Sequence, residues 1–164
     1  MDNLLVGIIG HQNSGKTETW KTLFGDIVRT GINERRLYLT DNEYVNVFLV
    51  SGSPEEREKY VGDIITVQKP RIVLCSMLYR KDVIGTLDYF IERDYFLYIQ
   101  WLNPGYQDRN DLPYHDYLGI VTYIQFKEST ISIRNGQSRI KTRIDEIRDY
   151  LYGWCKFKNL IIRE

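Results

Sequence analysis

The side chains with the clearest chemical meaning lie in residues 10–17, here named the glycine loop, which read Gly-His-Gln-Asn-Ser-Gly-Lys-Thr. They match the spacing G-x-x-x-x-G-K-[ST] at every specified position. Two glycines let successive backbone N–H groups face an anion, and a helix starting at the second glycine adds its positive dipole end. Lys16 would contact the β- and γ-phosphates, and the Thr17 hydroxyl would ligate Mg²⁺. The expected nucleotide-binding residues are Gly10, Gln12, Asn13, Ser14, Gly15, Lys16, Thr17 and Glu18.

The elements that must hold this loop are visible on both sides of it. Residues 4–9 are apolar throughout, which predicts a strand of the kind that parallel sheets bury. Residues 16–24 are compatible with a helix, and Gly25 can end it. On this arrangement we expect Lys16 to be an exposed cation that faces the ligand and lies outside the core.

Composition places limits on the remaining chemistry. The 164 residues fit one domain, 1–164. Lys plus Arg and Asp plus Glu number 22 each, so no net field favours nucleic acid or an anionic membrane. No apolar stretch approaches 18 residues and no secretory pattern begins the chain. Cys75 and Cys155 lie in apolar or aromatic surroundings, which predicts buried reduced thiols and a cytoplasmic protein.

Hydrophobic periodicity predicts the remaining elements. A polar turn between residues 36–40 and 44–50 predicts an antiparallel hairpin, and Ser53 with Glu56 predicts a capping box. The expected helices are 53–66, 82–93 and 138–154, and the expected further strands are 71–77, 95–102, 118–126 and 130–134. Recurring strand–loop–helix units predict an α/β three-layer fold with a mainly parallel sheet and one antiparallel hairpin.

The rest of the site should lie at the carboxyl ends of the parallel strands, where such sheets bind ligands. That rule places the glycine loop beside residues 50–54, 77–82 and 103–116. The last of these is the longest segment without predicted structure, and long loops in compact domains are usually functional or mobile.

The glycine loop and its flanking elements resemble the P-loop NTPase superfamily. The loop is most similar to that of Ras-like and translation-factor-class GTPases, which often place Asn at the position of Asn13 and end the next helix as Leu23-Phe24-Gly25 does. The resemblance implies binding of Mg²⁺ with ATP or GTP. It also implies that residues 26–36 and 51–57 act as switch segments that contact a protein partner.

Later motifs of those GTPases are absent. Where they carry Asp-x-x-Gly, this chain reads Val50-Ser51-Gly52, and where they carry Asn-Lys-x-Asp it reads Leu102-Asn103-Pro104-Gly105. Guanine specificity therefore lacks its usual carboxylate, and we expect weak base discrimination, with ATP bound at least as well as GTP. The ATPase pattern, an apolar strand that ends in an acid, is missing from residues 73–76 and 98–101 as well.

A carboxylate from elsewhere could complete the metal site. The candidates are Asp41, Glu43, Glu55, Glu56 and Asp82, each of which also has a structural use as a turn or capping residue. Gln100 or Ser76 could instead orient a water molecule. Arg29 and Thr30 could serve the transition state and the metal, whereas His11 is expected to point away from the phosphates and His115 to lie on the surface beside Asp116.

Three functions remain open on these residues. One is a switch-type NTPase that is slow on its own and regulated by a partner. Another is a nucleotide or small-molecule kinase, although the 103–116 loop offers only Arg109 for the phosphoryl clamp such enzymes need. The third is a non-hydrolysing module that uses bound nucleotide for stability or assembly.

Overall fold

A seven-stranded sheet forms the centre of the molecule, in a computed structural model that describes residues 1–108 and 113–164. The strands are β1 Asn3–Gly10, β2 Arg35–Tyr38, β3 Glu43–Val50, β4 Ile72–Leu78, β5 Tyr95–Leu102, β6 Thr130–Arg134 and β7 Ile162–Arg163. The helices are α1 Lys16–Phe24, α2 Val61–Ile64, α3 Val83–Glu92, α4 Ile120–Phe126 and α5 Ile140–Phe157.

The sheet is mostly parallel, as the sequence predicts. Its order is β2-β3-β4-β1-β5-β6, with parallel pairing from β3 through to β6. The antiparallel part is the β2–β3 hairpin together with β7, a short strand that the sequence did not reveal and that pairs with the start of β3. β1 lies between β4 and β5, so the loop that follows β1 sits at the middle of the sheet's carboxyl rim.

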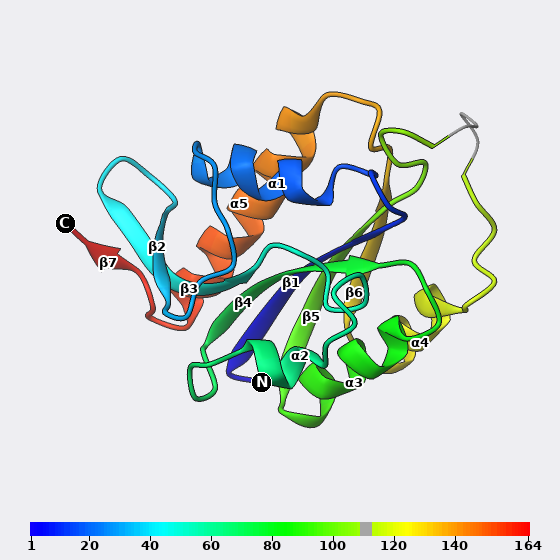
Figure 1. The fold of residues 1–164 in the computed structure, drawn as a ribbon. Helices are drawn as coiled ribbons and strands as arrows, with labels where there is room; N and C mark the ends of the chain where they lie inside the picture. The colour runs from blue at the N-terminus through cyan, green and yellow to red at the C-terminus, as the bar shows by residue number, and fades with distance from the viewer. Residues whose placement is uncertain (109–112) are drawn as a thin grey trace.

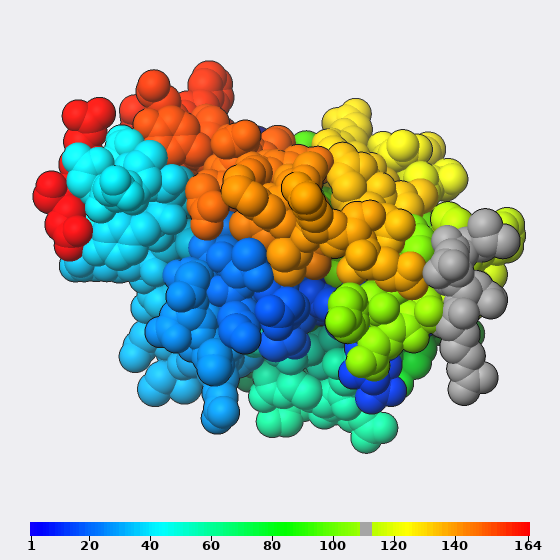
Figure 2. All heavy atoms as spheres, turned by 90° about the horizontal axis from the view of Figure 1, so that it is seen from above, coloured from blue at the N-terminus to red at the C-terminus, as the bar shows by residue number. Residues whose placement is uncertain are grey.

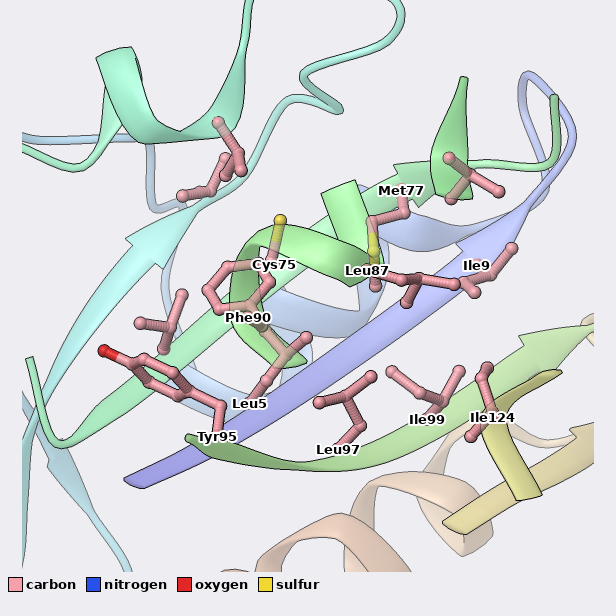
Figure 3. Packing of buried hydrophobic residues seen from close by; sticks show 14 of the residues in the cluster. Leu5, Ile9, Cys75, Met77, Leu87, Phe90, Tyr95, Leu97, Ile99 and Ile124 are labelled. Atoms are coloured by element: carbon pink, nitrogen blue, oxygen red, sulfur yellow. The ribbon is translucent and has the colours of Figure 1, made fainter. Parts of the chain in front are cut away.

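Helices cover both faces of the sheet. α1 and α5 lie on one face, and α2, α3 and α4 lie on the other (Figure 1). The alternating side chains of β1 serve both cores: Leu4, Val6 and Ile8 pack toward α1 and α5, while Leu5 and Ile9 pack toward α3 and α4 (Figure 3).

Gly7 in the middle of β1 is required by packing. A Cβ atom there would lie 2.3 Å from Cε of Met77 and 2.5 Å from Cδ1 of Ile99. Because Gly7 has no side chain, Met77 of β4 and Ile99 of β5 pack directly against the backbone of β1, the strand that leads into the glycine loop. The two cysteines are buried free thiols, as expected.

The predicted helix 53–66 is wrong. Only α2 is helical there, and Glu58 adopts a left-handed φ of 53° that ends the turn before it. The capping box does not form, because the hydroxyl of Ser53 has no partner among the described residues and Glu56 turns toward Lys16. Tertiary partners therefore outweigh the local capping pattern.

The predicted strand 118–126 is also wrong, because residues 120–126 form α4. Ile120 and Ile124 are both fully buried, which is the spacing of one helix face. The carboxylate of Asp116 accepts hydrogen bonds from the amides of Ile120 and Val121, the first turn of the helix. In the described residues no helix is long and apolar enough to cross a membrane.

Candidate functional site

The glycine loop connects β1 to α1 at the centre of the carboxyl rim, and its backbone follows a tight path. Asn13 and Gly15 have left-handed φ values of 60° and 104°, a conformation that is inexpensive only for glycine and, to a lesser degree, asparagine. Gly10 passes so close to Ser14 that a Cβ on the glycine would lie 2.2 Å from the serine Oγ. The fixed glycines of the pattern are therefore both required by geometry.

Two other loops hold the glycine loop from outside. The backbone amides of Tyr106 and Gln107 donate to the carbonyl oxygens of Ser14 and Asn13, at 3.0 and 3.3 Å. Gly105 and Gly136 permit this contact, since a Cβ on either would lie within 3.0 Å of Ser14. Figure 2 shows the two loops, in lime green and orange, meeting the blue N-terminal segment. The carbonyls of Asn13 and Ser14 are thus bonded outward, away from the amides that follow them in the chain.

The first turn of α1 presents free amides to this space. Among the described residues, the backbone N–H groups of Gly15, Lys16 and Thr17 have no hydrogen-bond partner. Such amides at a helix start, together with the helix dipole, form an anion-binding position.

Lys16 differs from the expectation that it would be exposed. Its side chain is buried, and its Nζ donates to the carbonyl oxygens of Gly10 at 3.2 Å and His11 at 2.7 Å. Nζ also lies 3.7 Å from Oε1 of Glu56. Burial lowers the pKa of Lys16, and the nearby carboxylate of Glu56 partly offsets that effect. The ammonium group is thus folded back on the loop and neutralised by an acid from the 51–57 segment.

A cleft of about 340 Å³, the first cleft, opens over these groups. Seven of the eight residues expected to bind nucleotide line it, and Gly10 lies behind Ser14. The full lining is Gln12, Asn13, Ser14, Gly15, Lys16, Thr17, Glu18, Ser51, Ser53, Glu56, Tyr106 and Gln107.

The two expected switch segments meet beside Thr17. The hydroxyl of Thr30 accepts a hydrogen bond of 2.8 Å from the backbone amide of Ser51. A further hollow is lined by Thr17, Ile27, Val28, Arg29, Thr30, Ser51, Gly52 and Arg57. The side chain of Thr17 is exposed where this hollow and the first cleft join.

Of the five candidate acids, only Glu56 lines the first cleft. Asp41 and Glu43 lie at the hairpin turn where β3 begins, at the opposite end of the sheet from the glycine loop. Asp82 pairs with Arg80 at 2.7 Å. Glu55 is buried and accepts hydrogen bonds from the amide of Leu78 and the hydroxyl of Thr86, both at 2.6 Å.

The proposed water-orienting and histidine residues also lie outside the first cleft. Ser76 accepts a hydrogen bond of 2.7 Å from the indole of Trp20, and Gln100 is buried against α5. His11 packs against Tyr79 and Tyr114, away from the cleft as expected, and His115 is exposed. Arg109 lies outside the described residues.

Sequence reasoning missed a second cleft of about 390 Å³ on the other side of Gly15. It is lined by Gly15, Glu18, Tyr106, Gly136, Ser138, Ile140 and Arg143. The available signal was Arg143, which falls three residues after Ile140 on the apolar face of α5 and is buried. An arginine inside an apolar stripe is unusual, because charged residues are almost never fully buried without a partner.

Comparisons of the chain with protein-family models, with curated proteins and with solved structures found no match. Within residues 1–108 and 113–164, no three His, Cys, Asp or Glu side chains lie together in a way that could hold a metal ion.

Proposed function

We propose that this protein binds a nucleoside triphosphate with Mg²⁺ in the first cleft, and that it acts as a slow, partner-regulated switch NTPase of the P-loop superfamily. One observation carries the proposal: free amides, an ammonium group and a free hydroxyl converge on one cleft from a single loop whose spacing suits phosphate. ATP and GTP are both candidates for the nucleotide.

Phosphate would compete with Glu56 for Lys16. In the structure Glu56 is the nearest counter-ion of the buried ammonium group. A triphosphate brings several negative charges to the same position, so like-charge repulsion would favour movement of Glu56 and of the 51–57 segment with it. Nucleotide binding would thereby be linked to the conformation of that segment.

The chain offers oxygen donors that suit Mg²⁺, which prefers oxygen ligands and usually keeps several of them from phosphate and water. The Thr17 hydroxyl lines the cleft and has no hydrogen-bond partner among the described residues, and the carboxylate of Glu56 faces the same space. When bound, the ion would neutralise charge on the transferred phosphoryl group. Thr17 would hold it, and Glu56, once displaced from Lys16, would orient the attacking water.

The two segments beside Thr17 support the proposal that a partner regulates the protein. The Thr30–Ser51 hydrogen bond joins residues 26–36 to residues 51–57, so a movement of Glu56 would be passed on to both segments through this bond. Ile27 and Ile32 are about 70% exposed in the first of these segments, which gives it apolar contact area. With only one of the five candidate acids at the cleft, Glu56, we expect hydrolysis well below the typical turnover of about 10 s⁻¹.

The test is isothermal titration of ATP and GTP with Mg²⁺, followed by measurement of phosphate release. The parent protein should bind, and Lys16→Ala should lose binding. Lys21→Ala, an exposed lysine near the end of the same helix, is the matched control. Because Lys16 is buried, circular dichroism must show that the variant is folded. Tight binding by a folded Lys16→Ala variant would refute the proposal, and binding without any phosphate release would leave only a binding module.

A further inference from the structure

Arg143 on α5 is a buried cation that the phosphate chemistry of the first cleft does not use. It is 5% exposed, and one terminal nitrogen donates to the hydroxyl of Thr19 at 2.6 Å. Among the ion pairs of the described residues none involves Arg143. Burial alone lowers its pKa, to about 10, so the guanidinium remains charged at neutral pH.

This guanidinium borders the second cleft and reaches the glycine loop. Its other terminal nitrogen lies 3.7 Å from the place that a Cβ on Gly15 would occupy. It has no hydrogen bond among the described residues, so donor capacity is left over at the cleft. This nitrogen is not among the fully buried unpaired side-chain atoms of the described residues, so it meets solvent at the cleft and can be offered to an acceptor there.

The second cleft continues from the first across three shared residues, Gly15, Glu18 and Tyr106. A nucleotide whose phosphates occupy the first cleft can therefore place its nucleoside in the second. The aromatic ring of Tyr106 and the side chain of Ile140 offer apolar contact to the faces of a flat ring, and Arg143 offers a donor to its edge. Apolar walls with a few converging polar groups are typical of small-molecule sites.

We propose that the second cleft holds the base of the bound nucleotide and that Arg143 selects a base with a carbonyl edge, in particular a 6-oxopurine. Guanidinium only donates hydrogen bonds. Guanine and hypoxanthine present O6 and N7 as acceptors, which arginine contacts together, whereas adenine presents an amino group beside N7. With adenine bound, the guanidinium of Arg143 and the 6-amino group of the base would be two hydrogen-bond donors facing each other in the cleft. This inference rests on the proposed function, because it needs phosphates in the first cleft.

The sequence-based expectation of weak discrimination considered only the missing carboxylate of the GTPase motif. Arg143 comes from α5 rather than from the loop after β5. The missing carboxylate would accept hydrogen bonds from the N–H groups of guanine, whereas Arg143 would donate hydrogen bonds to its acceptors O6 and N7. ITP distinguishes the two modes, since it keeps O6 but lacks the 2-amino group that a carboxylate would bind.

The test is titration of the parent, Arg143→Met and Arg148→Met with GTP, ITP, ATP and inorganic tripolyphosphate, all with Mg²⁺. We expect the parent to bind GTP and ITP at least about tenfold more tightly than ATP, in the range typical of one good base contact. Arg143→Met should reduce this preference to less than about threefold and leave tripolyphosphate affinity unchanged. Arg148→Met removes the same charge from the same helix outside both clefts and should behave like the parent.

Several results would overturn the inference. Equal affinity of the parent for ATP and GTP would do so, as would a preference that survives in Arg143→Met. A uniform loss that includes tripolyphosphate would show that Arg143 supports the glycine loop and not the base. If the parent binds none of the four compounds, the proposed function itself fails.

Folding of Arg143→Met is favoured because the change removes a buried charge, and Thr19 keeps its hydrogen bond to the carbonyl of Gly15. Tyr106→Ala gives an independent check, since the Tyr106 side chain is 65% exposed and only its backbone amide supports the glycine loop. It should weaken GTP and ATP binding and leave tripolyphosphate unaffected. Equal binding of GTP by this variant and the parent would argue against a base in the second cleft.

Discussion

At the scale of single residues, the site depends on how Lys16 is paired. The lysine is folded against the carbonyls of its own loop and is neutralised by Glu56, so the proposed phosphate ligand would have to replace contacts that already exist. Because the ammonium group of Lys16 has these partners, the protein avoids the free-energy cost of an unpaired buried charge. Under the proposed function, phosphate would displace Glu56 from Lys16, and Glu56 is the one of the five candidate acids that lines the first cleft.

Glu56→Gln should separate binding from hydrolysis. Loss of the carboxylate removes repulsion toward phosphate, so triphosphate affinity should be unchanged or tighter. Phosphate release should fall at least about tenfold, because a positioned acid or base typically contributes about 10²–10⁴-fold. Titration and a phosphate-release assay check both. Glu58→Gln, which changes an exposed glutamate outside the first cleft, is the control. Unchanged release in Glu56→Gln would remove Glu56 from the mechanism.

Thr17→Ala should weaken binding mainly when Mg²⁺ is present. Only the hydroxyl-to-metal contact is lost, so affinity should fall at least about tenfold with Mg²⁺, as for other contacts that support a bound metal. In EDTA it should change little. Thr17→Ser keeps the hydroxyl and should retain the parent's affinity. Equal losses with and without Mg²⁺ would contradict a metal role for Thr17.

At the scale of elements, the segment between β3 and β4 is built by tertiary contacts. Glu55 and Glu56 are neighbours in sequence but serve different elements: Glu55 bonds the end of β4 and α3, and Glu56 meets the glycine loop. The 51–57 segment therefore spans the rim between the first cleft and α3. Glu55 anchors it to β4 and α3 through hydrogen bonds, whereas Glu56 contacts the cleft through a single ion pair that a bound anion would disrupt.

Glu55 should make stability depend on pH in a definite direction. Burial raises its pKa above the ordinary value of 4.5, so the folded protein holds this proton more tightly than the unfolded chain. Its contribution to the free energy of unfolding is then greatest below pH 4.5 and falls as the pH rises through the folded pKa. Urea unfolding of the parent and Glu55→Gln between pH 4 and 7 should show the parent losing stability relative to the variant. A difference in unfolding free energy between parent and variant that did not change with pH would contradict the raised pKa of Glu55.

Thr30→Val should loosen the link between the two segments beside Thr17. The substitution keeps the shape of the side chain and removes the acceptor for the Ser51 amide, whose loss costs about 1–3 kcal/mol for a buried donor. Amide hydrogen exchange should become faster in residues 26–36 and 51–57. Thr40→Val, which changes a hydroxyl at the other end of the sheet, should leave those segments unaffected. Unaltered exchange in Thr30→Val would mean that this bond does not couple them.

At the scale of the whole molecule, three loops distant in sequence meet at one point of the sheet rim. The glycine loop follows β1, residues 103–108 follow β5, and residues 135–136 precede α5; they touch through Ser14, Tyr106 and Gly136. A ligand seated there contacts segments attached to both cores, so binding should stabilise the molecule as a unit.

That stabilisation is measurable as a shift in Tm. At a free ligand concentration of 100 times Kd, binding to the folded state alone adds about 2.7 kcal/mol. For a chain of this size the gain corresponds to a rise of about 5–10 °C. Thermal unfolding with and without GTP and Mg²⁺ checks it, with inorganic phosphate at the same concentration as the control. An unchanged Tm at saturating nucleotide would speak against binding.

Whether a structural feature could be predicted from the sequence depends on whether it is set by residues close together in the chain. The glycine loop, α1 and the buried strands were predictable, since glycine φ values, helix caps and alternating apolar residues act within a few positions. The helix at residues 120–126 was not predictable, because the four-residue spacing of Ile120 and Ile124 fits both a strand and a helix. Packing of both side chains against one face of the sheet favours the helix.

What only the tertiary structure decided is which distant residues share the site. The sequence by itself determined the α/β order and carried the prediction of a phosphate-binding loop. It ranked Glu56 no higher than four other acids and showed nothing of Tyr106 or Arg143 at the second cleft. Glu56 meets Lys16 across 40 positions of chain because β3 and the glycine loop end at the same rim. Such pairings depend on strand order, which no short window of sequence contains.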